Sequence, residues 1–302
     1  MSPPPIILIH RGDSFYLAHT IAQACSSNPD NRLILLGDRS NSFYLGVEHH
    51  HYEDYFDEAR EFAKLFTYEY FPNYQYPWIL FCHQKYFALY DFVREQGIEN
   101  FLLIDSDVLL YEPIEPYFSH YSNAKLTVTS PDTAEAAAAG FAIVNTPEIV
   151  SELCATYTDM FTAKGAGYLD RTETPLFTEM AGIYRLWQNN PESVVNTHDT
   201  AGEFVINSSV LVDHRFMRKN GLLEIHWQDR VPHFARVESG EFVKSPIIHF
   251  HGHAKKVMSR HLKLRGISVR LTHAANRMMS ALAKYPMRAT NRIMKRAVFP
   301  GI

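Results

Sequence analysis

Cysteine is scarce in this sequence. The 302 residues include only three, Cys25, Cys82 and Cys154, which are odd in number and widely spaced. A disulfide framework or a zinc site needs cysteines in paired, closely spaced sets, so this pattern argues against both. Three isolated thiols among apolar neighbours are typical of a protein that stays in a reducing compartment.

Long hydrophobic runs are also absent. The first apolar run covers only positions 6–9 and has no basic residue before it, so we expect neither a signal peptide nor a membrane span. Hydrophobic residues nevertheless make up 46% of the chain, enough for a large core in one large domain or two small ones. We therefore expect a folded protein of the cytoplasm.

Acidic residues are missing after Glu241. The same stretch contains thirteen Lys and Arg residues, which leaves sixteen basic residues against thirty-three acidic ones elsewhere. We therefore divide the chain into a body, residues 1–255, and a basic helical tail, residues 256–302. In the tail the basic residues are interleaved with Leu, Ile and Met, as in amphipathic helices that lie on anionic membrane surfaces.

Two interpretations of this tail remain open. It binds the cytoplasmic face of a membrane, or it packs its apolar face on the acidic body of the same protein. Nucleic acid would attract the same charge, but the sequence contains no recognisable nucleic-acid-binding module, so we expect no nucleic-acid partner.

The hydrophobic pattern of the body alternates between strands and helices. We expect strands at 6–10, 32–37, 101–104, 124–129, 140–145 and 247–250, and helices at 14–27, 83–96 and 147–161. Such alternation predicts an α/β fold. His49, His50 and His51 are consecutive and do not share one face, so we interpret them as a solvated loop without a metal.

The most informative stretch is Asp105-Ser106-Asp107, which directly follows the apolar residues 101–104. Ligands of open α/β sheets bind outside the carboxyl ends of the strands. Two carboxylates separated by one residue can both face a hard divalent ion such as Mn²⁺ or Mg²⁺ across a bend. The alternative is an ordinary polar turn at the end of a strand.

Residues 78–113 resemble the D-x-D region of GT-A glycosyltransferases. In those families an amphipathic helix with a basic residue precedes a strand that ends in the motif, and Lys85 matches the basic residue here. The resemblance implies a GT-A-type (Rossmann-like) α/β fold with a central mixed sheet flanked by helices. It also implies that Lys85 and Ser106 belong to the donor site.

A second motif lies near the tail, in Ile248-His249-Phe250-His251-Gly252-His253-Ala254-Lys255. His249, Gly252 and Lys255 match the H-x-x-G-x-x-K element of glycosyltransferase family 8 and related retaining enzymes. The resemblance implies that His249 is a third metal ligand, that Gly252 lets the backbone approach a diphosphate, and that Lys255 neutralises it. Taken alone, His249 would equally suit a histidine of the core.

The same resemblance suggests further site residues by position in the fold. His10 and Arg11 follow the first strand and Asp38 follows the second, where such enzymes bind the nucleoside. Asp170 and Glu173 lie where family 8 carries a D-Q-D triplet, so we name them as candidate catalytic carboxylates. This chain departs from that triplet, and an acidic first turn of a helix explains Glu173 equally well.

The resemblance implies metal-dependent transfer of a sugar, with a UDP-sugar favoured as donor, to a glycan or lipid-linked acceptor, with retention. The alternatives are a haloacid-dehalogenase-like phosphohydrolase, a nucleotidyltransferase and an inactive sugar-nucleotide-binding module. The phosphohydrolase would need a later Asp pair, and the sequence has no Asp-Asp dipeptide. A nucleotidyltransferase usually carries a Gly-rich basic loop after its first strand, which positions 10–13 do not supply.

Overall fold

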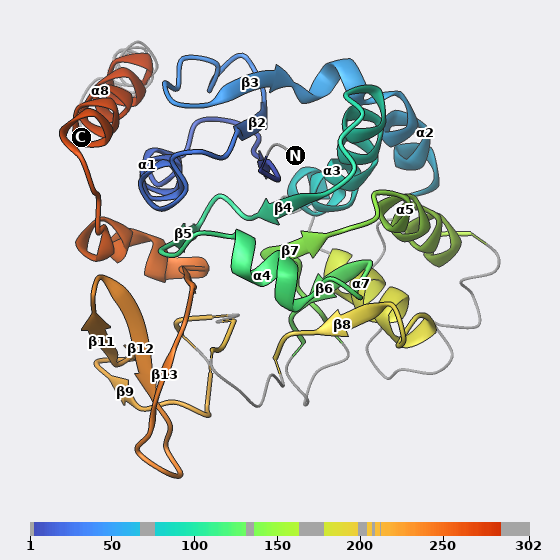
Figure 1. Cartoon of the computed structure of the whole chain (residues 1–302). Helices are drawn as coiled ribbons and strands as arrows, with labels where there is room; N and C mark the ends of the chain where they lie inside the picture. Colours follow the sequence, from blue (N-terminus) through green and yellow to red (C-terminus); the bar gives the residue numbers. More distant parts are fainter. Residues whose placement is uncertain are drawn as a thin grey trace, which may run out of the picture.

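A seven-stranded sheet crosses the centre of the molecule (Figure 1). The computed structural model describes residues 3–66, 76–130, 136–162, 178–198, 204–206, 209–211 and 213–284. In spatial order the strands are β3 (Glu48–His51), β2 (Leu33–Gly37), β1 (Ile6–Ile9), β4 (Phe101–Ile104), β7 (Phe141–Val144), β6 (Leu126–Val128) and β8 (Val194–Asn196). Neighbours pair in parallel, except that β7 is antiparallel to both β4 and β6. The predicted α/β class with a central mixed sheet is confirmed.

Alternation of side chains along the strands explains why the sheet is covered on both faces. In β1, Ile7 and Ile9 belong to one core cluster, and Ile6 and Leu8 belong to another. The helices are α1 (Leu17–Ser27), α2 (Asp57–Leu65), α3 (Tyr76–Glu95), α4 (Glu115–His120), α5 (Glu148–Met160), α7 (Glu179–Asn189) and α8 (Ile267–Ala283). Figure 1 shows α1 and α8 on one side of the sheet and α2, α3, α5 and α7 on the other.

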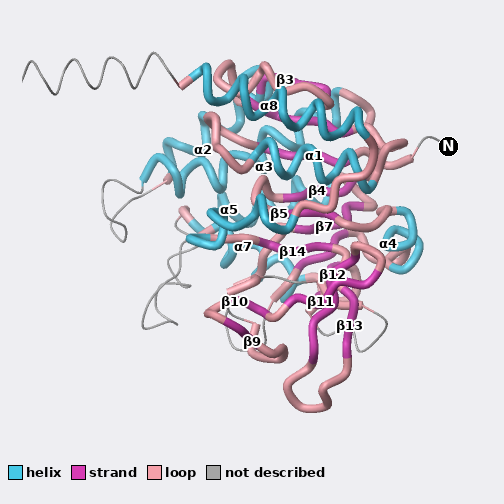
Figure 2. Tube along the Cα trace, turned by 90° about the vertical axis from the view of Figure 1, so that its left-hand side faces the viewer, coloured by secondary structure: helices cyan, strands magenta, loops and turns pink. Residues whose placement is uncertain are grey.

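A smaller β region extends the molecule beyond the central sheet. Strand β5 (Val108–Leu110) leaves the end of β4 and pairs antiparallel with β14 (Ile247–His249). Figure 2 shows the strands stacked from β3 at the top to a protruding hairpin at the bottom. The remaining short elements are β9 (Arg218–Lys219), β10 (Leu222–Leu223), β11 (Ile225–Gln228), β12 (Val231–Ala235), β13 (Phe242–Lys244) and the 3-10 helices η1 (Tyr52–Tyr55) and η3 (Gly252–His261).

The histidine triplet is a strand, so our interpretation of it as a solvated loop was wrong. Residues 48–51 form β3, which pairs in parallel with β2 at the edge of the sheet. His49 Nε2 lies 2.9 Å from the side-chain oxygen of Asn41, and the ring of His50 packs 4.9 Å from that of Phe92. An edge strand can be half-exposed, so it needs no apolar alternation to pair with its neighbour.

Helix α8 docks on α1 through polar side chains. Asn276 and Ser280 are buried against the body, whereas Ile267, Leu271 and Leu282 are exposed. For this helix the structure contradicts the interpretation that the tail packs its apolar face on the body. Residues 285–302 of the tail lie outside the described residues. Within the described part of the chain, none of the helices is both long and apolar enough to cross a membrane.

Candidate metal and nucleotide site

A tight turn between β4 and β5 holds the two carboxylates of the D-x-D motif. The backbone N–H of Asp105 donates to the carbonyl of Gly140 at 3.0 Å, and the N–H of Val108 donates back to the carbonyl of Asp105 at 3.1 Å. Thr20 on α1 donates its hydroxyl to the carbonyl of Ser106 at 2.6 Å. The turn is therefore held from both neighbouring layers, and its two carboxylates cannot separate freely.

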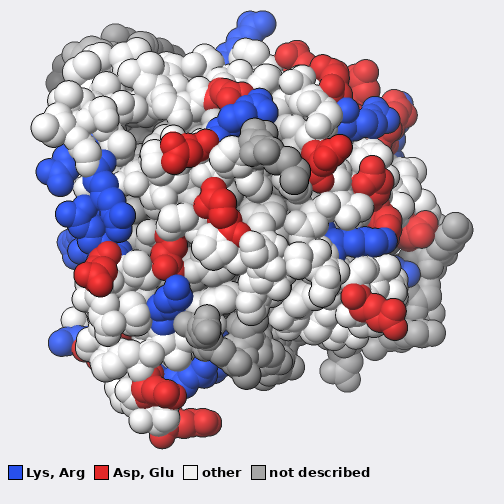
Figure 3. All heavy atoms as spheres, in the orientation of Figure 1, with Lys and Arg blue, Asp and Glu red and all other residues white. Residues whose placement is uncertain are grey.

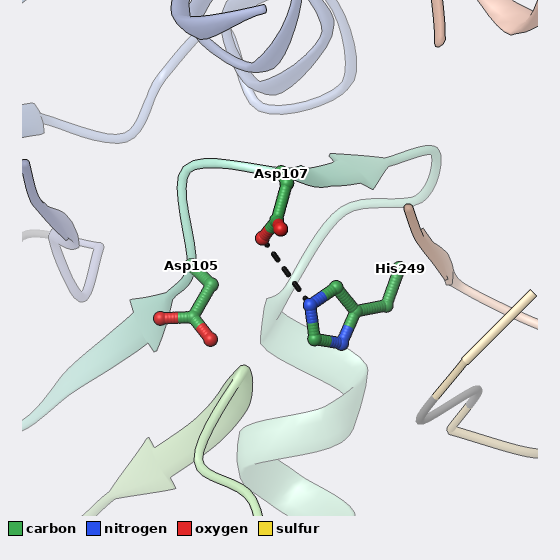
Figure 4. A group of neighbouring side chains, drawn as sticks. All are labelled: Asp105, Asp107 and His249. Carbon is green, nitrogen blue, oxygen red and sulfur yellow. Dashed lines mark ion pairs between the residues drawn. The ribbon is translucent and has the colours of Figure 1, made fainter. Parts of the chain in front are cut away.

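Strand β14 brings His249 to the same place. His249 pairs with Val108 in the antiparallel ladder, and the N–H of Phe250 donates to the carbonyl of Asp107 at 2.9 Å. Figure 4 shows the side chains of Asp105, Asp107 and His249 directed toward one common space. One ligand atom from each of the three lies within 4.8 Å of the others, a spacing that suits a single metal ion.

Gly140 keeps this space open. A Cβ atom at this position would lie 3.1 Å from Cε1 of His249 and 3.2 Å from Oδ2 of Asp105. Both contacts are tighter than ordinary van der Waals separation, so a larger residue would push the two candidate ligands away. The glycine is thus required by the close approach of two side chains.

Two lysines balance the carboxylates. Lys255 Nζ lies 2.9 Å from Asp107 Oδ2, and Lys85 Nζ lies 3.2 Å from Asp105 Oδ1. Burial alone would lower the pKa of each lysine, but the facing carboxylate outweighs burial and raises it. Both lysines are therefore charged at neutral pH.

Asp107 is the centre of this charge cluster. His249 Nε2 lies 3.2 Å from its Oδ1, on the side opposite the Lys255 contact. Burial favours the neutral acid, but the hydrogen bond and charge of His249 and the charge of Lys255 prevail and lower the pKa of Asp107 well below its usual range. The carboxylate is ionised, as a metal ligand must be.

A cavity of about 380 Å³, the central pocket, opens in front of this cluster. It is lined by Ile9, His10, Arg11, Tyr16, Pro77, Trp78, Phe81, Cys82, Lys85, Asp105, Ser106, Asp107, Glu179 and Lys255. The structure therefore brings together seven of the residues expected from sequence: His10, Arg11, Lys85, Asp105, Ser106, Asp107 and Lys255. Three chain segments, which follow β1, open α3 and follow β4, form most of its walls.

His10 is held in place at the base of the pocket. Its Nδ1 lies 2.8 Å from the hydroxyl of Ser106, and burial lowers its pKa to about 4, so the ring is neutral at physiological pH. Its Nε2 is buried and has no hydrogen-bond partner among the described residues. Beside it, the guanidinium of Arg11 lies over the ring of Phe81 at 5.8 Å.

Asp38 and Gly252 lie near the pocket but do not line it. Asp38 accepts a hydrogen bond of 2.6 Å from the backbone N–H of Gly12, so it shapes the loop that carries His10 and Arg11. Gly252 has a φ of +59° and only one atom within 4 Å of an added Cβ, at 3.8 Å. The left-handed backbone conformation therefore favours glycine at this position. A lack of space for a side chain is not the reason.

The candidate catalytic residues Asp170 and Glu173 lie outside the described residues. Glu179, which the sequence analysis missed, lines the central pocket at the start of α7. Burial raises the pKa of Glu179, against the opposing charge of Lys85. Thr178 precedes it in an extended conformation at the start of the helix, but that local pattern does not indicate a place in the pocket.

The chain matches neither a protein-family model nor a curated protein sequence. Its fold is similar to that of mouse xyloside xylosyltransferase 1 (10% identity, 64% of this chain and 84% of that chain, TM-score 0.47). It is also similar to the glycosyltransferase GlyE of Streptococcus pneumoniae TIGR4 (11%, 90% and 63%, 0.44) and to the galactosyltransferase LgtC (13%, 89% and 99%, 0.41).

Proposed function

We propose that this protein is a metal-dependent glycosyltransferase that transfers a sugar from a nucleotide-sugar donor, with a UDP-sugar favoured. The observation that carries the proposal is the convergence of Asp105, Asp107 and His249 within 4.8 Å at the edge of a pocket that also contains Lys85 and Lys255. Two carboxylates, one imidazole and two cations form an environment suited to a diphosphate bound through a metal.

The three candidate ligands suit Mn²⁺ or Mg²⁺. Both metals accept carboxylate oxygen, and an added imidazole favours Mn²⁺ over Mg²⁺. The open space beside Gly140 leaves room between Asp105 and His249. When bound, the metal would polarise the diphosphate oxygens and stabilise the charge that develops on the leaving group.

Lys255 would share that task. In the structure its ammonium pairs with Asp107, and it also lies 4.8 Å from the ring centre of Tyr16. We propose that Lys255 turns from Asp107 toward the diphosphate when a donor is bound, which places a positive charge beside the leaving oxygens. His10, Arg11 and Asp38 would hold the nucleoside side of the donor, and Ser106 and Gly252 would lie along the phosphates.

Glu179 is our candidate for the carboxylate that faces the transferred sugar. It lines the same central pocket as Asp105 and Asp107, on a different element, and its charge interacts with that of Lys85. A carboxylate at this place can accept hydrogen bonds from sugar hydroxyls or stabilise the oxocarbenium-like transition state of transfer. Asp170 and Glu173 remain candidates for the same role.

We further propose retention of the anomeric configuration and a glycan or lipid-linked acceptor. Retention is supported only by the H-x-x-G-x-x-K resemblance. The lipid-linked acceptor is supported by the basic tail, which would hold the enzyme at the cytoplasmic face of a membrane. NMR of the product formed from an α-linked donor tests the first point, because inversion would give the β-linked product.

A thermal-shift panel tests the central proposal. UDP, GDP, CMP and their common sugars are added with Mn²⁺ or with EDTA, since a ligand that binds only the folded state raises the Tm. We expect a rise with one nucleotide class, UDP first, that EDTA abolishes. If none of the nucleotides shifts the Tm, sugar transfer is refuted and a phosphohydrolase becomes the first alternative to assay. A shift without transfer to any acceptor would identify an inactive binding module.

A further inference from the structure

A second hollow, of about 390 Å³, lies apart from the central pocket and shares none of its lining residues. We call it the basic hollow. It is lined by Arg230, Leu262, Lys263, Leu264 and Arg270, that is, by three cations and two leucines. No carboxylate lines it, and no described acidic residue forms an ion pair with any of the three cations. Such a site suits an anion that also carries an apolar part.

The three cations come from three different segments, namely the β11–β12 turn, the stretch after η3, and α8. Lys263 lies over the ring of Trp227 on β11 at 4.1 Å, and its backbone N–H donates to the side chain of Gln23 on α1 at 2.8 Å. Arg270 on α8 donates to the carbonyl of Leu264 at 3.4 Å. Arg230 lies in the β11–β12 turn with a φ of +71°. Lys263 and Arg270 are thus held by contacts with neighbouring residues, and the exposed Arg230 completes the hollow from the turn.

An exposed apolar stripe continues from the hollow along α8. Ile267, Leu271, Met278 and Leu282 are 78%, 66%, 59% and 59% exposed. They recur at i, i+4, i+11 and i+15, with Ala274 between them at i+7, and so share one face of the helix. We call this face the outer stripe. Arg270 lies beside it, next to its first two members.

Helix α8 cannot rotate to bury the outer stripe without losing its polar contacts. Asn276 accepts a hydrogen bond from the N–H of Leu45 and donates to its carbonyl, at 2.8 and 2.9 Å. Ser280 donates to Asp13 at 2.7 Å, and a ring nitrogen of His19 lies 2.8 Å from one of His273. The fold therefore holds the apolar side of α8 toward solvent.

We propose that the basic hollow and the outer stripe form one docking site for an anionic bilayer, with a phospholipid headgroup phosphate in the hollow. Arginine and lysine bind phosphate through charge-assisted hydrogen bonds, and the stripe would enter the boundary between headgroups and acyl chains. Figure 3 shows Lys and Arg gathered at the left-hand edge, over the segment between η3 and α8, below an uncharged surface formed by α8. This combination of charge and apolar surface complements an anionic membrane.

The proposed docking site is more specific than a general attraction of the basic tail to a membrane. It assigns a role to Arg230, which belongs to the β11–β12 turn and lies outside the tail, and it sets the orientation of the protein on the bilayer. It refines the proposed membrane-side location but does not depend on sugar transfer, because the two sites share no residue.

Flotation of the full-length protein with vesicles tests the proposal. We expect binding to phosphatidylcholine vesicles that contain about one third phosphatidylglycerol, and little binding to pure phosphatidylcholine. Arg230→Glu and Lys263→Glu should each reduce the partition coefficient about tenfold or more, because each reverses a charge at the membrane surface. Leu271→Glu should reduce it to a similar degree by placing a carboxylate in the stripe.

Arg94→Glu is the matched control, since Arg94 is an exposed arginine on α3 and its replacement changes the net charge by the same amount. If Arg230→Glu floats no differently from Arg94→Glu, the hollow has no role and the proposal is refuted. The Tm without any ligand should be the same in all four variants as in the wild type, which shows that they are folded and keeps this test independent of nucleotide binding in the central pocket.

Two further outcomes would also overturn the proposal. Inorganic phosphate at constant ionic strength should not displace the protein from vesicles; displacement at low millimolar phosphate, with Leu271→Glu binding normally, would indicate a soluble phosphate ligand. Gel filtration should give the same elution volume for the wild type and Leu271→Glu. A smaller species in the variant would mean that the stripe joins two copies of this chain.

Discussion

Asp107 is held in the candidate site both by its side chain and by its backbone. Its two oxygens face His249 and Lys255, and its backbone carbonyl accepts the N–H of Phe250. Side chain and backbone thus connect the turn after β4 to both β14 and η3. A substitution that removes the charge of Asp107 but keeps the shape of its side chain therefore tests the charge alone, because the backbone contacts stay in place.

We expect Asp107→Asn to abolish the Mn²⁺-dependent binding of nucleotide while the protein remains folded. The amide keeps the shape of the carboxylate but lacks the charge that a hard cation requires. Isothermal titration with UDP and Mn²⁺ measures the loss. Asp91→Asn is the control, because Asp91 is also a carboxylate in an ion pair with little exposed surface, but it does not line the central pocket. Wild-type affinity in Asp107→Asn would refute the metal assignment.

Glu179→Gln should affect turnover more than binding. If Glu179 faces the transferred sugar, removing its charge should lower kcat by about 100-fold or more and leave nucleotide affinity within about twofold. Steady-state kinetics together with titration of UDP separates the two effects. An equal loss in both would instead mean that Glu179 only maintains the pocket through Lys85.

His83 links stability to pH. It is fully buried among aromatic rings, its Nδ1–H donates to the carbonyl of Ile79, and burial lowers its pKa from 6.5 to about 4. As the pH falls below 6.5 the unfolded chain takes up a proton that the folded protein still refuses, so stability falls until about pH 4.

We therefore expect His83→Phe to weaken the pH dependence of the unfolding free energy. Between pH 7.5 and 5.0 the wild type should lose about 2 kcal/mol that the variant keeps. Urea unfolding at both pH values measures the difference. His214→Gln, which replaces an exposed histidine, should behave as the wild type. Equal pH dependence in all three proteins would mean that His83 is not the responsible group.

At the scale of elements, α8 is held by a few polar contacts. Asn276 is completely buried, and its side-chain amide pairs with both the N–H and the C=O of Leu45. Its removal would take away both hydrogen bonds to the backbone of Leu45, which are partly buried, at a cost of about 0.5–1.5 kcal/mol for each.

We expect Asn276→Ala to release α8 locally while the central sheet stays intact. Hydrogen exchange should become faster in α8 and in the loop around Leu45, and remain unchanged in β1 and β4. Ala274→Ser, an exposed change on the opposite face of the same helix, is the control. If exchange rises equally throughout the protein, α8 is part of the global folding unit.

The elements that could be predicted from the sequence are those that the hydrophobic pattern determines. Strand β4 was predicted to the residue and α5 to within one residue at each end. In both, the buried residues form a clear apolar pattern between polar segments of the sequence. Strand β3 was missed because an edge strand of histidines has no such pattern. The outward face of α8 was beyond prediction, because amphipathicity identifies an apolar face but not its neighbour.

The site was predictable only in part, for a similar reason. The two motifs identified the candidate ligands Asp105, Asp107 and His249, which the structure brings together. Glu179 was not identified, because its place in the pocket depends on how α7 packs against α3, and no local pattern encodes that contact. Sequence motifs thus identified the candidate metal ligands better than the other residues that line the pocket.

At the scale of the whole molecule, the central pocket joins distant parts of the chain. Lys85 comes from α3, Asp107 from the turn after β4, and Lys255 from η3. A metal and a diphosphate bound there would connect the central sheet to the smaller β region.

We therefore expect Mn²⁺ with UDP to slow hydrogen exchange in α3, β5, β14 and η3 together, and EDTA to reverse the effect. Strand β3 and helix α5, which lie away from the pocket, serve as internal references. Protection confined to α3 would indicate that the nucleotide binds without engaging His249 and Lys255.

The antiparallel pairing of β5 with β14 determines which parts of the sequence can be altered without disturbing the candidate site. Residues Val108 and His249 are direct partners in it, so the distance between the candidate metal ligands depends on this local pairing. It does not depend on the length of chain that joins the two strands. The exposed turn between β12 and β13, at residues 237–240, can therefore be lengthened, shortened or replaced without moving the ligands, whereas Gly140 and Glu179 in the same intervening segment must be kept. An engineer who wishes to change the outer surface of the smaller β region can work on that turn alone and leave the candidate site untouched.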